Sequence, residues 1–372
     1  MDPRWIRVLA AVASFLVLAV GGVLILGRVD PGDPDPIFFA FANAANVLAL
    51  ILAVAMLGAI ATYLAIELAQ TGSMRSIASQ FTTRTFVIIP IAIALNIILG
   101  QTVVAALKLP IYLDSIGTIL VGVLAGPIAG ALTGILANFL WAYVIPPPFQ
   151  YPPAAAFAVV AAVIGLLAGS YSRLGLLRPR TDRPIGELVV GGAIGAALVI
   201  GLAFLGFVGY RAFLSAVGGG DPSLAPTPNN PVFDSPVFIA LGWLAIALVA
   251  ATVIGLAALL VVRRDLTATY VVVCGMVTGI AAALISAPIA AGVFGGVTGA
   301  GTDFLVAAFR QAGVDLRLAT LGQGLISDPI DKVTTFFVVY LIVSAMARRT
   351  KARYPQGERL VDARMAPEEG AA

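Results

Sequence analysis

Long uncharged apolar runs, separated by short polar segments, make up most of the 372-residue chain. A helix needs roughly 20 apolar residues to cross the hydrocarbon core of a membrane. Eight runs meet or approach that length: residues 8–26, 37–66, 86–107, 116–145, 154–171, 188–210, 236–262 and 266–302. A ninth, residues 333–347, is shorter and spans only if Asp331 and Lys332 lie in a wet or protein-lined site. The pattern predicts an all-α polytopic membrane protein.

One of these runs, residues 116–145, is too long for a single straight crossing and carries Gly126-Pro127 near its middle. Proline removes a backbone hydrogen bond and disfavours helix at the residue before it. We therefore predict a hairpin of two helices, one ending near Ala125 and one over about 128–145. The chain then makes about ten crossings.

The distribution of basic residues predicts the orientation, because cytoplasmic loops retain Lys and Arg. With the N-terminus inside, the broken hairpin leaves 16 of the 22 basic residues on the inner side and six outside. A single crossing over 116–145 would instead place the arginine-rich loop at 173–183 outside. We predict a cell-membrane protein whose N- and C-termini are both cytoplasmic.

Composition narrows the function further. Charged residues make up 11% of the chain, against roughly 25% in ordinary globular proteins, which excludes a large soluble domain. The absence of histidine excludes imidazole base catalysis and histidine metal ligation. The single Cys274 allows no internal disulfide and no thiolate cluster. We predict a protein that is not an enzyme, with no cofactor, no metal and no nucleic-acid partner.

A few ionisable residues lie at or near membrane depth, where each costs several kcal/mol unless it is paired or wetted. Asp114 lies at the outer end of the broken hairpin, and Asp303 ends a glycine-rich stretch. Asp328, Asp331 and Lys332 lie where the last apolar run begins. All are on the outer side in the predicted topology, so they could converge on one outward-facing site.

Structural roles compete with this hypothesis. Asp328 before Pro329 has the pattern of a helix N-cap, and Asp331 would then favour the positive end of the helix dipole. Asp331 and Lys332 are adjacent and point in different directions, which argues against a mutual pair. Asp114 could likewise cap the helix that follows it.

Uncharged side chains add to the candidate site. Asn138 and Trp141 are three residues apart, on one face of the second half of the hairpin. The amide needs a partner and the indole offers a stacking surface, so the pair could form a ligand wall; Trp141 also suits an interfacial anchor. Gln323 and the segment around Tyr151 are further candidates. Glycines at every fourth position from 122 to 134 would allow close helix packing, either within the chain or against a membrane partner.

Two stretches carry a family resemblance. The first reads Leu-Pro-Ile-Tyr-Leu-Asp-Ser-Ile-Gly-Thr-Ile-Leu over 109–120, followed by Leu-Ala-Gly-Pro at 124–127 and Gly-Ala-Leu-Thr-Gly at 130–134. The second begins Ser-Ala-Pro-Ile-Ala-Ala at 286–291 and ends Gly-Leu-Ile-Ser-Asp-Pro-Ile-Asp-Lys at 324–332. Together they resemble the substrate-binding S components of energy-coupling factor (ECF) transporters. The resemblance implies a six-helix core that captures a vitamin or related micronutrient for ATP-driven uptake with a membrane coupling subunit and cytoplasmic ATPases.

The resemblance also divides the chain. It implies a core of four helices over 84–183 and two helices plus an outer loop segment over 266–350. Residues 1–83 are then a two-span extension, residues 184–265 a two-span insertion, and residues 351–372 a disordered cytoplasmic tail. Family sites are built from outer loops and the later helices, which fits Asn138, Trp141, Asp303, Gln323, Asp328 and Asp331.

Two other functions stay open. One is a membrane sensor or scaffold that keeps the S-component-like fold without transport, with the arginine-rich loop and basic tail contacting a cytoplasmic partner. The other is a secondary transporter, because residues 124–130 loosely echo residues 285–291 and repeats with broken helices mark many such carriers.

Overall fold

The computed structural model describes residues 3–26, 44–100, 111–147, 149–180, 264–300, 302–311 and 313–361, with parts of 183–204 and 247–262. Most of these residues are helical, and none of them lies in a strand. Of the span predicted at 188–210, the structure describes 188–198 and a few positions beyond, and of the span predicted at 236–262 it describes scattered positions from 247 on. The outer loop between them lies outside the described residues.

Helices in the described ranges account for most of the predicted spans. They are α1 Pro3–Leu26, α2 Ala44–Thr71, α3 Arg75–Ala78, α4 Thr83–Gly100, α5 Ile116–Ala125, α6 Pro127–Tyr143, η3 Pro152–Ala155, α7 Ala158–Arg173, α10 Thr267–Phe294, α11 Asp303–Gln311, α12 Leu316–Ala345, α13 Arg348–Lys351 and η4 Gly357–Leu360. Four of them, α1, α2, α4 and α10, contain a stretch long and apolar enough to cross a membrane. The all-α membrane character is therefore supported, and the count of about ten crossings stays a prediction.

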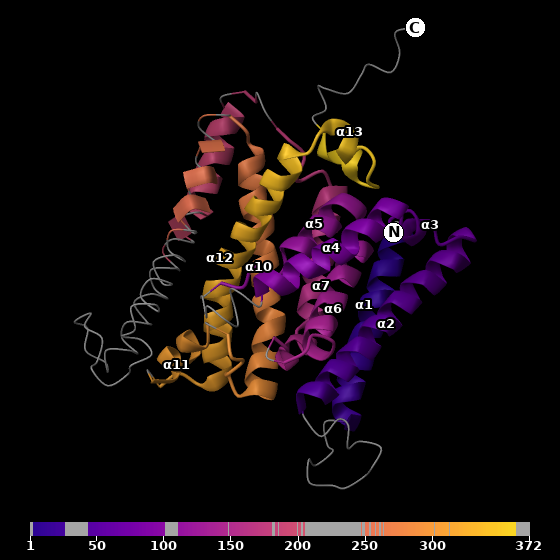
Figure 1. The fold of residues 1–372 in the computed structure, drawn as a ribbon, viewed down its shortest axis with the longest axis vertical. Helices are drawn as coiled ribbons and strands as arrows, with labels where there is room; N and C mark the ends of the chain where they lie inside the picture. The colour runs from indigo at the N-terminus through magenta and orange to yellow at the C-terminus, as the bar shows by residue number, and fades with distance from the viewer. Residues whose placement is uncertain are drawn as a thin grey trace, which may run out of the picture.

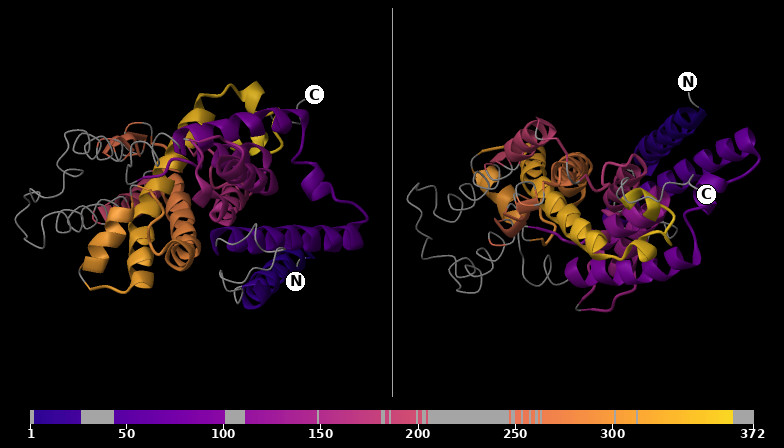
Figure 2. Two further views of the ribbon diagram at one scale, coloured as in Figure 1. Left: turned by 60° about the horizontal axis from the view of Figure 1, so that its bottom comes forward. Right: turned by 90° about the horizontal axis from the view of Figure 1, so that it is seen from above.

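The helices form a bundle whose two ends carry different short elements. Helices α10 and α12 pack along each other, and α5, α6 and α7 form the neighbouring group (Figure 1). Helices α1 and α2 pair with each other on the far side of that group (Figure 2). One end of the bundle carries α3 and α13, and the other carries α11 (Figure 1).

The predicted break at Gly126-Pro127 is confirmed. Helix α5 ends at Ala125, Gly126 has a φ of 136°, and Pro127 is the first residue of α6. The Gln80 side-chain oxygen accepts hydrogen bonds from the amides of Ile128 (2.9 Å) and Ala129 (3.3 Å). The first amides of a helix have no acceptor within the helix, and this one oxygen accepts from two of them at the start of α6. A side chain at 126 would be strained at this φ and would collide with Gln80.

The glycines spaced by four serve packing within the chain. A Cβ added to Gly165 of α7 would lie 2.3 Å from the carbonyl carbon of Gly130, and one added to Gly130 would lie 2.6 Å from the Cα of Gly122. Backbones of α5, α6 and α7 therefore touch without intervening side chains, as small residues allow in membrane bundles.

The alternative role of Asp328 as a helix N-cap is wrong. Helix α12 begins at Leu316 and is capped by Asp315, whose side chain accepts from the Arg317 amide at 2.9 Å. Asp328 and Pro329 lie in the middle of this 30-residue helix. Helix α10 runs just as continuously through Pro288, whereas the matching segment at 124–130 is broken. The echo between 124–130 and 285–291 is therefore not a structural repeat.

The tail predicted to be disordered is ordered over residues 351–361. The Gln356 amide donates to the Leu124 carbonyl at 2.9 Å, and the Arg178 guanidinium donates to the Val361 carbonyl at 3.0 Å. Leu360 is 1% exposed. The segment folds back because the last carbonyls of α5 lack partners within their helix and because Leu360 has an apolar place to pack. Residues 362–372 lie outside the described residues.

Candidate functional site

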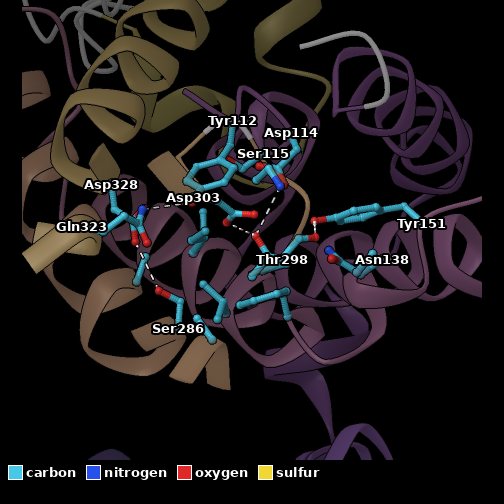
Figure 3. Close-up of a pocket in the computed structure, with 18 of the residues that line it drawn as sticks. Tyr112, Asp114, Ser115, Asn138, Tyr151, Ser286, Thr298, Asp303, Gln323 and Asp328 are labelled. Atoms are coloured by element: carbon cyan, nitrogen blue, oxygen red, sulfur yellow. Dashed lines mark hydrogen bonds between the residues drawn. The ribbon is translucent and has the colours of Figure 1, made fainter. Parts of the chain in front are cut away.

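A cavity of about 90 Å³ lies between the loop 111–115, helices α6, α7, α10 and α12, and the segment leading into α11 (Figure 3). At roughly 10–15 Å³ per water molecule, this volume suits a small organic molecule. Seven of the eight predicted site residues line the cavity: Asp114, Asn138, Trp141, Asp303, Gln323, Asp328 and Lys332. Asp331 is not among the lining residues.

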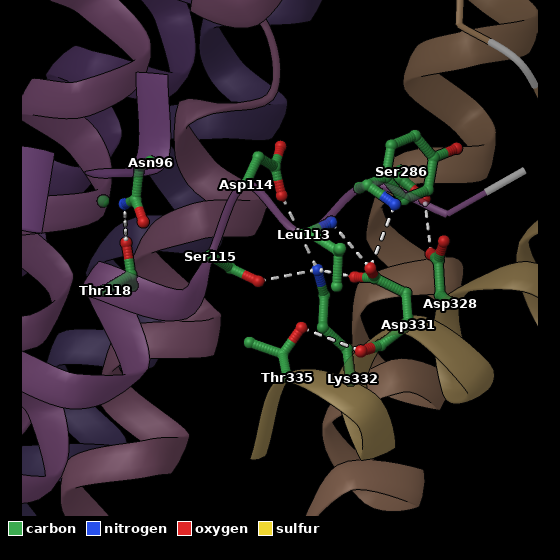
Figure 4. A network of polar contacts seen from close by, with 12 residues as sticks. Asn96, Leu113, Asp114, Ser115, Thr118, Ser286, Asp328, Asp331, Lys332 and Thr335 are labelled. Atoms are coloured by element: carbon green, nitrogen blue, oxygen red, sulfur yellow. Dashed lines mark hydrogen bonds and ion pairs between the residues drawn. The ribbon is translucent and has the colours of Figure 1, made fainter. Parts of the chain in front are cut away.

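Asp331 instead clamps the loop 111–115 onto α12 (Figure 4). Its side chain is fully buried, and one carboxylate oxygen accepts from the amides of Tyr112 (2.9 Å) and Leu113 (2.8 Å). Leu113 has a φ of 53°, a conformation that nonglycine residues rarely adopt. These bonds hold the strained loop in place, so the contribution of Asp331 to the site is positional.

The expectation that Asp331 and Lys332 do not pair is wrong. The Lys332 ammonium lies 2.5 Å from the second carboxylate oxygen of Asp331, although the two residues are adjacent on α12. The same ammonium donates to the Ser115 hydroxyl at 2.9 Å and lies 3.8 Å from Asp114. Asp114 thus faces Lys332; the residue at the N-cap position of α5 is Ser115, which makes no side-chain capping bond.

Asp328 lies on the cavity wall and is 5% exposed. Its carboxylate contacts the hydroxyls of Ser327 at 3.3 Å and Ser286 at 3.4 Å. Gln323 extends this polar strip, since its amide donates to the Ser327 hydroxyl at 2.7 Å and to the Tyr112 hydroxyl at 3.2 Å.

Aromatic side chains form another part of the wall. The Trp141 ring lies 4.9 Å from that of Tyr151, centre to centre. The indole donates to the Phe149 carbonyl at 3.0 Å, and the Tyr151 hydroxyl donates to the Thr298 carbonyl at 2.7 Å. Trp141 is 4% exposed, so it serves the interior of the protein and not the membrane interface. The Asn138 amide donates to the Gly134 carbonyl of its own helix at 3.0 Å and lines the cavity.

Asp303 shapes the glycine-rich segment before α11. One carboxylate oxygen accepts from the Thr298 hydroxyl at 2.9 Å and the other from the Gly299 amide at 2.7 Å. This carboxylate fastens the segment 298–303 against the cavity. Among the described residues, no group of three or more His, Cys, Asp or Glu side chains is placed to hold a metal ion.

Burial controls protonation in the loop 111–115. It raises the pKa of the Tyr112 hydroxyl well above its ordinary value, so this hydroxyl stays neutral. Burial also raises the pKa of the Asp114 carboxyl, and the nearby Lys332 ammonium acts in the opposite direction.

Sequence reasoning missed Tyr112, Ser115, Ser286 and Thr298 as lining residues. Tyr112 and Ser115 flank Asp114 in the first family-like stretch, and Ser286 opens the second. Their place in these two stretches was the signal that the sequence offered. The residue types alone were weak evidence for a site, because a lone hydroxyl in an apolar run indicates a site less strongly than a charge does.

Comparisons with family models, with curated proteins and with solved structures gave no match to this chain. The case for a function therefore rests on the cavity and on the sequence motifs around it.

Proposed function

We propose that the chain is a substrate-binding membrane subunit that captures a small micronutrient for uptake, in the manner of an ECF S component. The observation that carries the proposal is the position of the cavity. It lies where the two family-like stretches meet, with loop 111–115 from the first and Asp328 and Lys332 from the second on its wall. Asp331 links the two stretches directly.

The proposed direction of capture follows from the predicted topology. Asp303 and Val306 of α11 line the cavity, and α11 lies at the opposite end of the bundle from α13 (Figure 1). The basic residues at 348–353 mark the α13 end as cytoplasmic under the positive-inside rule. The cavity is then open to ligand from outside, in a cell-membrane protein with cytoplasmic termini.

Uptake requires partners. The chain has no Gly-x-x-x-x-Gly-Lys-Ser/Thr sequence, so energy would come from cytoplasmic ATPases acting through a membrane coupling subunit. The docking pattern often used in the family, Ala-x-x-x-Ala, is absent from α4, which has Ala92 and Ala94. A coupling subunit that binds this chain would therefore use another surface.

The two alternatives draw less support. A sensor or scaffold needs its basic cytoplasmic residues for a partner, yet Arg178 and Arg359 donate to the chain's own carbonyls at Val361 and Arg173. A secondary transporter was suggested by the echo at 285–291, where α10 is unbroken.

Native mass spectrometry of the full chain, purified in mild detergent, tests the proposal. We expect a small-molecule adduct on the wild-type protein and its loss in Trp141→Ala. Phe149→Ala removes an aromatic ring that is 55% exposed and does not line the cavity, so it should keep the adduct. Affinity purification from cells should also recover a membrane subunit and ATPases. Wild-type protein that carries no adduct and no partner subunits would refute the proposed function.

A further inference from the structure

We infer that the ligand is a small organic cation, an ammonium group attached to a ring, with the ammonium bound at Asp328. The inference rests on the proposed function, because it concerns the same cavity. It adds the chemical class of the ligand and the residue that selects it.

The cavity lining has more acidic than basic side chains. Three carboxylates, those of Asp114, Asp303 and Asp328, line it, and Lys332 is the basic residue among its lining residues. Lys332 is already compensated by Asp331 behind it. An empty cavity with this inventory carries an excess of negative charge, which a cation would reduce and an anion would increase.

Lys332 is already engaged by groups of the chain. Its ammonium has three donors; two of them donate to Asp331 at 2.5 Å and to Ser115 at 2.9 Å, and the ammonium also forms an ion pair with Asp114 at 3.8 Å. A carboxylate or phosphate on a ligand would compete with Asp114 for the remaining donor.

Asp328 is the carboxylate best placed to bind a ligand cation. Asp114 faces Lys332, and Asp303 uses both oxygens to fasten the segment 298–303. Asp328 receives hydroxyl contacts at 3.3 and 3.4 Å, which are long for a charged acceptor, since hydroxyl–carboxylate bonds are usually 2.5–2.7 Å. No Lys or Arg of the described residues makes a salt bridge with Asp328. The Lys332 ammonium acts on Asp328 only from beyond ion-pair distance. A ligand ammonium in direct contact with this buried carboxylate would offset more of the cost of burying it at membrane depth.

The side of the cavity opposite Asp328 is the reason for inferring a ring in the ligand. Tyr151 lies across the cavity from Asp328 (Figure 3), with Trp141 packed against it. Phe157 and aliphatic side chains of α7 and α10 also line the space. A ring that contacts the aromatic side would place an ammonium on a short spacer at the Asp328 side.

Matched probe pairs test this selectivity on the full chain in detergent. Each pair shares a ring and differs in charge: 3-phenylpropylamine with 3-phenylpropionate, and tryptamine with indole-3-propionate. Binding is measured by isothermal titration calorimetry and by the shift in unfolding temperature. We expect the amines to bind and stabilise the protein, and the carboxylates to bind at least tenfold more weakly.

Two substitutions on the same helix locate the selecting charge. Asp328→Asn should weaken amine binding by tenfold or more, because it removes the partner of a buried ammonium. Asp315→Asn is the control: it removes the same charge from α12 but keeps a good N-cap at an exposed position, so amine binding should be unchanged.

Three results would overturn the inference. They are equal or tighter binding of the carboxylates, binding of no probe at millimolar concentration, and equal amine affinity in Asp328→Asn and wild type. In each case an adduct in native mass spectrometry that is lost in Trp141→Ala would leave the proposed function standing, with a ligand of another class or with a cation bound at another residue.

Discussion

Asp331 holds the loop 111–115 against α12, and its replacement by asparagine should release that loop. The substitution keeps the size of the side chain and removes its charge. An asparagine oxygen can still accept from the backbone amides of Tyr112 and Leu113, but its NH₂ group would then face the Lys332 ammonium, which lies 2.5 Å from the present carboxylate oxygen. Two donors would meet where a donor and an acceptor meet now.

The expected cost comes mainly from the uncompensated ammonium. Lys332 is 3% exposed and would keep Asp114, at 3.8 Å, as its nearest carboxylate. Removing one member of a buried ion pair typically costs about 3–5 kcal/mol. We therefore expect Asp331→Asn to lower the free energy of unfolding by about 3–5 kcal/mol. Ligand binding should weaken as well, since loop 111–115 contributes Tyr112 and Asp114 to the cavity wall.

Equilibrium unfolding of the purified chain in mixed detergent micelles, followed by circular dichroism, measures this cost. Lys332→Met and the double variant Asp331→Asn/Lys332→Met complete a double-mutant cycle. The double variant should be more stable than Asp331→Asn alone by at least about 1 kcal/mol, because the buried ammonium that lost its closest carboxylate is removed. A single-variant cost below about 1 kcal/mol, or costs that simply add, would refute the proposed clamp.

Three further predictions test the packing, the C-terminal segment and the topology. Gly165→Ala should destabilise the protein by about 1–3 kcal/mol through overpacking, whereas Gly192→Ala, where a Cβ meets no atom within 4 Å, should be neutral in the same thermal unfolding assay. Leu360→Ala should cost about 2–5 kcal/mol; no change in unfolding temperature would mean that the C-terminal segment does not pack. In whole cells, a membrane-impermeant maleimide should label Val297→Cys, at a residue that is 71% exposed, and should not label Arg353→Cys. The reverse labelling pattern would show that the topology is the opposite of the predicted one.

Local sequence signals were sufficient where the structure depends on local physics. The break at Gly126-Pro127 follows from the geometry of two residues and appears where it was predicted. They failed at Asp328-Pro329, which has the pattern of a helix start and lies inside α12. A Cβ on Gly279 of α10 would come within 2.4 Å of the Pro329 Cα, so the two helices touch there. This contact joins residues that lie far apart in the sequence, at the point where α12 contains its proline. A local sequence pattern cannot predict such a contact.

The prediction of disorder for residues 351–361 failed for a related reason. A short polar segment with Pro355 and Gly357 has the composition of disorder. Its order depends on one apolar side chain, Leu360, and on a hydrogen bond to the carbonyl of Leu124 more than 200 residues earlier in the sequence. Composition counts the residues of a segment and contains no information about acceptors elsewhere in the chain.

The candidate site was predicted as a set of residues, but their division of labour was not. Asp328 and Asp331 are three positions apart on α12, so they face directions that differ by about 60° at 100° per residue. That difference is enough to turn one carboxylate toward the loop 111–115 and Lys332, and the other toward the cavity. The Asp331 carboxylate accepts from two backbone amides and contacts an ammonium, whereas the Asp328 carboxylate has two long hydroxyl contacts. Asp331 neutralises Lys332 from behind, so the carboxylate of Asp328 is the one that the inferred cation would meet, and the sequence alone gives no means of telling these two roles apart.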